Sequence, residues 1–183
     1  MHYASIENIS KSFGIRTLFK DITINIEEGD KIALVARNGS GKSTLLKIIA
    51  GIEPPDQGKR WVHQDIKPVM LLQDTQFDPQ STIRDHILSM DHPVIRVVKA
   101  YEDMLQSHSE DQHKLADLMS QMDEMNAWNI EQEMIQILGQ LNLHSPEQKM
   151  GTLSGGQQKR VSLAQTLIES KLHDGNCLLI LDE

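Results

Sequence analysis

A glycine-rich run lies between an apolar segment and a helix-forming segment near residue 40, and it restricts the folds open to this chain. Residues 31–35 are mostly apolar, residues 36–44 read Ala-Arg-Asn-Gly-Ser-Gly-Lys-Ser-Thr, and residues 43–50 are helix formers that end at Gly51. A strand, a loop and a helix in this succession are typical of α/β folds that bind phosphate. The glycines let backbone N–H groups turn inward, and the helix N-terminus adds partial positive charge. The run therefore predicts an anion cradle, called here the phosphate loop (residues 36–44).

Side chains of the phosphate loop extend this prediction to ATP with Mg²⁺. Lys42 is expected to neutralise the β and γ oxygens, and the Ser43 hydroxyl is expected to ligate Mg²⁺. The other loop residues expected to contact the nucleotide are Asn38, Gly39, Ser40, Gly41 and Thr44. Ala36 stands where such loops usually begin with glycine, and its methyl group restricts the backbone, so we expect weaker binding at worst. The alternative is a glycine-rich turn with a surface lysine.

Two kinds of apolar pattern divide the chain. Segments rich in branched residues predict strands over residues 4–9, 22–26, 31–35, 59–62 and 69–73. From about Thr82 onward the apolar period is helical. One helical face is apolar at Leu115, Leu118, Met119 and Met122, and another at Ile130, Met134, Ile137, Leu138 and Leu141.

Local signals mark the starts of these helices. Thr82 is followed three residues later by Asp85, Pro93 suits a first helical turn, and Ser109 stands three residues before Gln112. The methionines of the helical region are interpreted as core packing. They are Met119, Met122, Met125 and Met134.

A serine followed by two glycines precedes a further helix. Residues 153–160 read Leu-Ser-Gly-Gly-Gln-Gln-Lys-Arg, and a helical run continues to about Ser170. Ser154 is expected to cap this helix, and Gly155 and Gly156 let its first N–H groups approach a γ-phosphate closely. With Gln157, these residues are expected to contact a nucleotide held by another subunit or domain. Alone, a Ser-Gly-Gly helix cap is a common local motif.

An apolar run over residues 177–183 ends in two acids. It has the form of a buried parallel strand that presents carboxylates at its C-terminal tip. Asp182 and Glu183 are therefore candidates to hold a metal ion and a water molecule. The alternative is a core strand with two solvated acids at its end. Cys177, in this run, is the only cysteine, which excludes an internal disulfide and favours a reducing cytoplasm.

The phosphate loop, the Leu-Ser-Gly-Gly-Gln run and the acidic strand together resemble the ATP-binding cassette (ABC) family. The resemblance implies an α/β fold of the P-loop NTPase type (ABC-type), with a mixed sheet around the phosphate-loop helix and an inserted α-helical subdomain. The expected division is a nucleotide-binding core over residues 1–80, a helical subdomain over residues 81–150, and the signature helix with the Walker B strand over residues 151–183. The chain stops at Glu183, before the family's D-loop aspartate and switch histidine, so we expect a fold truncated after the Walker B strand.

The same resemblance implies roles for single residues. Asp182 would hold Mg²⁺ through water, and Glu183 would polarise the water that attacks the γ-phosphate. Gln73 matches the family's Q-loop glutamine, which reaches Mg²⁺ and that water. Phe13 occupies the place where family members stack an aromatic ring on adenine, with a core phenylalanine at a strand end as the alternative. Glu183, Lys42 and Gln73 are thus the expected catalytic residues.

Charge and composition limit the partners. The formal net charge is -8, and residues 84–150 carry five basic and twelve acidic side chains, so this stretch repels phosphates on average. No apolar run approaches the roughly 20 residues that span a bilayer. The eight histidines show no ligand spacing, which predicts no metal site beyond Mg²⁺.

Residues 127–141 and 152–164 resemble the first cassette of the ABC-F group, most of all its Uup-type members. Gln73 and Leu153 are 80 positions apart, which is longer than in most transporter cassettes. The resemblance implies a cytoplasmic ATP hydrolase with no membrane domain, in which a second cassette completes the ATP sandwich. It also implies engagement of the ribosome, RNA or branched nucleic acid through regions absent here.

Residues 1–183 alone are expected to bind ATP feebly and to hydrolyse it hardly at all. Two alternatives stay open: the nucleotide-binding subunit of an ABC transporter, and a non-hydrolysing scaffold gated by nucleotide.

Overall fold

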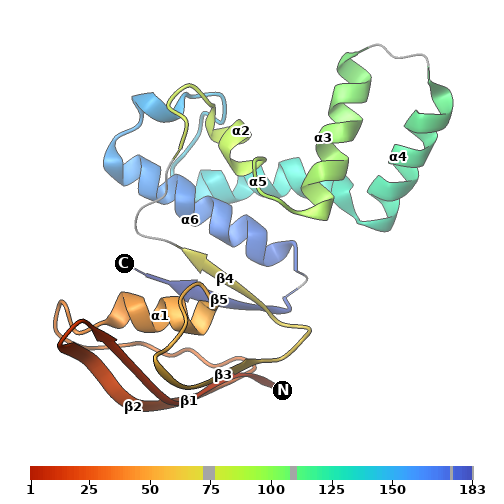
Figure 1. Ribbon diagram of the computed structural model, residues 1–183. Helices are drawn as coiled ribbons and strands as arrows, with labels where there is room; N and C mark the ends of the chain where they lie inside the picture. The colour runs from red at the N-terminus through yellow and green to blue at the C-terminus, as the bar shows by residue number, and fades with distance from the viewer. Residues whose placement is uncertain (72–76, 108–110, 174, 183) are drawn as a thin grey trace. The chain divides into compact units, whose positions relative to one another are not determined.

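A computed structural model describes residues 1–71, 77–107, 111–173 and 175–182. The chain forms two compact units (Figure 1). The sheet unit comprises Met1–Gln73 with His173–Glu183, and the helical unit comprises Asp74–Leu172. The phosphate loop lies in the sheet unit, and the Ser-Gly-Gly cap lies in the helical unit.

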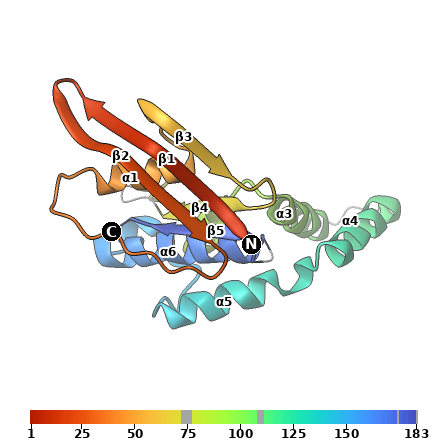
Figure 2. The ribbon, with the colours of Figure 1, turned by 90° about the horizontal axis from the view of Figure 1, so that it is seen from below.

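Three antiparallel strands of the sheet unit lie in the order β2-β1-β3. They are β1 His2–Phe13, β2 Arg16–Glu27 and β3 Gln57–Val62. β1 and β2 form a long hairpin in which Phe13 pairs with Arg16, and Gly14 in the turn has a φ of 59°. Figure 2 shows the three strands side by side. The strands predicted over residues 4–9, 22–26 and 59–62 are confirmed.

Two further strands pair in parallel within the same unit. They are β4 Lys67–Leu71 and β5 Cys177–Leu181, with Val69 opposite Leu179. β4 contains the first part of the strand predicted over residues 69–73, whose last two residues lie outside the described ranges. β5 is the strand predicted to lead into Asp182.

The strand predicted over residues 31–35 is not formed. These residues carry no strand assignment, and neither described sheet includes them. An apolar segment becomes a strand only when a neighbour accepts its ladder hydrogen bonds. The segment flanks a cavity described below, and Val35 is almost fully exposed.

Helix α1 Lys42–Ala50 follows the phosphate loop. Gly41 and Gly51 cap its two ends, both in the left-handed region, as glycine permits. Its buried residues Leu45, Ile48 and Ile49 share one apolar core with residues of β1 and β5. Burial on both sides fixes the helix, and so fixes the loop at its N-terminus.

The helical unit consists of α-helices and two short 3₁₀ helices. They are α2 Ile83–Ile87, α3 Pro93–Gln106, α4 Gln112–Glu124, η1 Ala127–Asn129, α5 Ile130–Gln140, η2 Met150–Thr152 and α6 Gly155–Lys171. Thr82 and Asp85 form the predicted capping box of α2, and Pro93 is the first residue of α3. α4 is instead capped by Asp111, whose side chain accepts from the N–H of Lys114; Ser109 lies outside the described residues.

The methionine prediction is right for two of four residues. Met122 and Met134 are buried in the core of the helical unit. Met119 and Met125 are 43% and 38% exposed, so their assignment to the core is wrong. α4 buries only Leu118 and Met122, because a helix with one covered face turns neighbouring positions such as 119 toward solvent.

Candidate functional site

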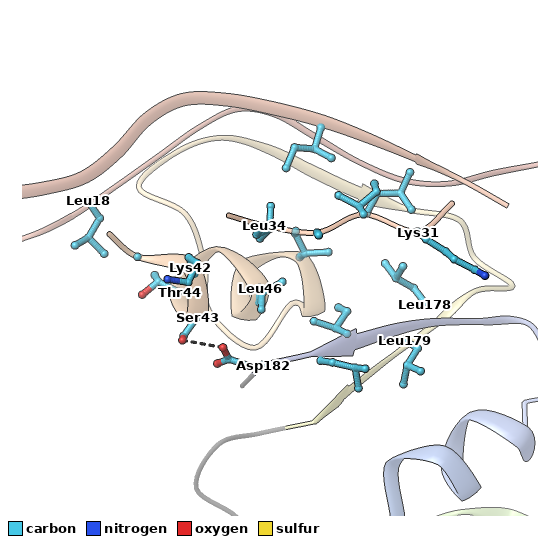
Figure 3. Close-up of a pocket in the computed structure, with 18 of the residues that line it drawn as sticks. Leu18, Lys31, Leu34, Lys42, Ser43, Thr44, Leu46, Leu178, Leu179 and Asp182 are labelled. Atoms are coloured by element: carbon cyan, nitrogen blue, oxygen red, sulfur yellow. Dashed lines mark hydrogen bonds between the residues drawn. The ribbon is translucent and has the colours of Figure 1, made fainter. Parts of the chain in front are cut away.

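A cavity of about 1150 Å³ lies in the sheet unit beside the phosphate loop. Its walls come from β2, residues 30–34, the loop, α1, β5 and Asp182. Figure 3 shows Leu34, Leu46 and Leu178 in its apolar part and Lys42, Ser43 and Asp182 at its polar end. The cavity thus combines an apolar wall with a small set of charged and polar groups, as ligand sites commonly do.

The loop backbone depends on its glycines. Gly39 and Gly41 have φ angles of 75° and 97°, which L-residues rarely adopt. A Cβ atom at Gly41 would also lie 3.0–3.1 Å from side-chain atoms of Phe19 and Leu18. Ala36 is not among the non-glycine residues with positive φ in the described chain. Its methyl group therefore needs no left-handed backbone where the family usually has glycine.

Lys42 lies over this loop. Its Nζ donates to the carbonyl oxygens of Ala36 at 2.9 Å and Arg37 at 3.3 Å. Lys42 is half-buried and lines the cavity, so its ammonium group lies beside the space where an anion would bind. A lysine in this place supplies positive charge to an anion in the cradle.

Ser43 and Asp182 meet at the polar end of the cavity. The Ser43 hydroxyl donates to Oδ1 of Asp182 at 2.9 Å, although 139 positions separate the two residues. Asp182 is 8% exposed, so this hydrogen bond offsets part of the cost of burying its carboxylate. A hydroxyl and a carboxylate are the hard oxygen donors that Mg²⁺ prefers, and they fit a Mg²⁺ site.

The remaining predicted metal and catalytic residues cannot be placed. Gln73 and Glu183 both lie outside the described residues. Among the described residues, no group of three or more His, Cys, Asp or Glu side chains could hold a metal ion.

Phe13 lies at the end of β1 and lines the cavity. It is 55% exposed, so the alternative of a core phenylalanine is wrong. Lys11 Nζ lies 5.8 Å from the centroid of its ring, and Lys11 is itself held by Glu53 and Asp56. The ring is therefore exposed enough to stack on a planar ligand, with a fixed cation beside it.

The Ser-Gly-Gly residues have the predicted local geometry in the helical unit. Ser154 caps α6, and Gln157 completes a capping box by accepting from the Ser154 N–H at 2.9 Å. A Cβ at Gly155 or Gly156 would meet no atom within 4 Å. The first turn of α6 is therefore open to an approaching anion.

One residue that contacts the loop was not predicted from the sequence. Arg16, the first residue of β2, donates from Nη2 to the carbonyl oxygen of Gly39 at 3.1 Å. No motif marks it, because the contact joins two residues that are 23 positions apart and meet only through the hairpin.

Comparisons with known proteins agree with this geometry. Residues 19–183 match the family model described as ABC transporter. The chain is 35% identical, over its whole length, to the ABC transporter ATP-binding protein YfmR of Bacillus subtilis. It is 30% identical over 92% of its length to the energy-dependent translational throttle protein EttA of Escherichia coli, and 28% identical over its whole length to the ATP-binding protein Uup of the same species.

The chain spans only 29%, 31% and 29% of the lengths of these three relatives. A solved ABC transporter ATP-binding protein from Pyrococcus furiosus has the same fold, with a TM-score of 0.64, 18% identity and coverage of 98% of this chain and 90% of that one. Among the residues described, none of the helices combines the length and apolar character that a membrane span requires. The family match, the relatives and the fold agree, and the chain belongs to the ABC transporter family as an ATP-binding cassette of the P-loop NTPase fold.

Proposed function

We propose that the full-length protein is an ABC-F type ATPase, which couples ATP binding and hydrolysis to a conformational cycle in translation or nucleic-acid transactions. One observation carries the nucleotide part of the proposal. The cavity brings the phosphate loop, Lys42 and the hydrogen-bonded pair of Ser43 and Asp182 to one place. These groups suit the terminal phosphates of ATP and its metal ion.

Different residues of the sheet unit bind different parts of the nucleotide and its metal ion. Loop N–H groups and Lys42 bind the β- and γ-phosphates, and Phe13 stacks on adenine. Ser43 and Asp182 would hold Mg²⁺, which would neutralise charge on the phosphate oxygens. The resemblance to the family assigns Gln73 the role of orienting the attacking water.

Hydrolysis needs a base and a closed site. Glu183 polarises water for in-line attack on the γ-phosphorus, so that the bond to the β-phosphate oxygen breaks and ADP and phosphate leave. Ser154, Gly155, Gly156 and Gln157 contact the γ-phosphate bound by a second cassette, whose own signature closes this site. Excluding water in this way strengthens each charge interaction within the site.

The name of one relative, EttA, favours a role in translation. EttA is named a translational throttle protein, and Uup is named an ATP-binding protein. A cytoplasmic protein that engages the ribosome through regions outside this chain accords with the acidic stretch at residues 84–150, which suits RNA poorly. The second candidate is the nucleotide-binding subunit of a transporter, which the name of YfmR favours.

Ribosome association tests the proposal. In the full-length protein, Glu183→Gln is expected to bind ATP without hydrolysing it and to cosediment with ribosomes only when ATP is present. The matched control carries Lys42→Ala as well, and it should lose the ATP-dependent fraction because it lacks the loop cation. Equal sedimentation with and without ATP, or recovery in the membrane fraction instead, contradicts the role in translation.

A further inference from the structure

Arg16 joins the hairpin that carries Phe13 to the phosphate loop. Phe13 and Arg16 are paired residues at the end of the β1–β2 hairpin. From there the Arg16 guanidinium reaches the loop, where Nη2 donates to the Gly39 carbonyl at 3.1 Å. The function proposed above does not use this contact, but the contact lies at the same nucleotide site.

The contact fixes a peptide at the centre of the loop. The Gly39 carbonyl and the Ser40 N–H belong to one planar trans peptide and point in opposite directions. The carbonyl accepts from Arg16, and the Ser40 N–H donates to the Arg37 carbonyl at 3.2 Å. Both ends of this peptide are therefore held, and its rotation requires loss of the Arg16 bond.

Two cationic side chains donate to different carbonyl oxygens of the loop. Lys42 binds those of Ala36 and Arg37, and Arg16 binds that of Gly39. In the proposed function Lys42 turns to the phosphate oxygens, and it then leaves its two carbonyls. Arg16 is the cation that stays on the backbone.

β2 also supports the loop by packing. Side-chain atoms of Leu18 and Phe19 lie 3.0–3.1 Å from the position that a Cβ of Gly41 would take, so this part of β2 packs against the loop. No carboxylate in the described part of the chain forms an ion pair with Arg16. A guanidinium donates in a rigid planar fork, which suits it to hold a carbonyl in one direction.

We propose that Arg16 is a positioning residue of the nucleotide site. It holds the Gly39–Ser40 peptide of the phosphate loop in one orientation and links the hairpin that carries Phe13 to the loop. Its charge-assisted hydrogen bond uses only atoms of this chain, so it does not require nucleotide to order the loop. The inference rests on the proposed binding of ATP by this loop.

Two measurements on the full-length protein test it: the affinity for ATP with Mg²⁺ by calorimetry, and amide hydrogen exchange of residues 37–44 without nucleotide. Arg16→Gln is expected to weaken ATP binding about tenfold and to speed exchange of the loop, because a charge-assisted hydrogen bond is lost. Arg16→Lys should bind ATP within about threefold of the wild type, because an ammonium group can still donate to the carbonyl. Thermal unfolding of each variant establishes that it is folded.

Lys20→Gln is the matched control, since it removes the same charge from an exposed position on the same strand. It should change neither readout. The inference is overturned if Arg16→Gln binds ATP as the wild type does, if its loop exchanges at the wild-type rate, or if Lys20→Gln has the same effects. If the wild type itself binds no ATP, the proposed function is wrong and this inference falls with it.

Discussion

Ser43 and Asp182 form the contact that best distinguishes a metal site from a simple loop. A buried carboxylate is costly unless it is paired or hydrogen-bonded, and Asp182 accepts from a hydroxyl that follows the phosphate-loop lysine. The bond joins the Ser43 hydroxyl to Oδ1 of Asp182. It therefore holds together the two side chains to which the proposed function assigns Mg²⁺.

Asp182→Asn tests this role. The amide keeps the shape of the side chain but removes its charge, so the Mg²⁺ concentration needed for half-maximal ATP binding should rise about 10- to 100-fold. Titration of Mg²⁺ at fixed ATP measures it in the full-length protein. Asp30→Asn is the control, since Asp30 also lines the cavity but accepts from the Glu27 N–H. An unchanged Mg²⁺ requirement in Asp182→Asn contradicts the metal site.

Single residues were predictable where their partners are close in sequence. The Ser154 cap and its Gln157 partner are three residues apart, and the sequence indicated the cap from local rules. Ser43 and Asp182 were each indicated as metal-binding candidates by their own local motifs, but the hydrogen bond between them was not predicted. Arg16 was missed because its contact with Gly39 is made by strand pairing, which no local pattern encodes.

At the scale of elements, helices were easier to predict than strands. The starts of α2 and α3 agree with Thr82 and Pro93, because a capping box and a first-turn proline act within one helical turn. Residues 31–35 have the composition of a strand but are not paired. A strand needs a partner from elsewhere in the chain, and composition alone does not supply one.

In the helical unit, one arginine forms ion pairs that join three helices, called here the three-helix pair. Arg84 of α2 bonds Glu102 of α3 at 2.6 Å and Glu131 of α5 at 2.7 Å. Burial works against the charge of Arg84, but hydrogen bonds and charges from Glu131 and Glu102 outweigh it, so the pKa of the guanidinium rises. The arginine therefore stays charged and joins the three helices.

Arg84→Met should lower the free energy of unfolding by about 1 to 2 kcal/mol, because the partly buried carboxylate of Glu102 and the more exposed carboxylate of Glu131 lose their common partner. Chemical denaturation measures it. Arg96→Met is the control: its pair with Asp91 is largely exposed, and its loss should cost about 0 to 0.5 kcal/mol. Equal losses in the two variants contradict a structural role for the three-helix pair.

At the scale of the whole molecule, the C-terminal residues 173–183 belong to the same sheet unit as the N-terminal residues 1–73. β5 comes from the C-terminal part of the chain but pairs with β4 and joins the core of α1. The phosphate loop and Asp182 meet because of this pairing. The sequence indicated both ends of the site, and parallel pairing of distant strands brought them together.

The proposed function requires that this loop and Lys42 bind the terminal phosphates of ATP. Isothermal titration of the full-length protein with ATP and Mg²⁺ tests it most directly. The account predicts binding heat for the wild type and an affinity about 10- to 100-fold lower for Lys42→Ala, which loses a charged partner of the phosphates. Folded wild-type protein that gives no binding heat, or a Lys42→Ala variant that binds equally well, would contradict it.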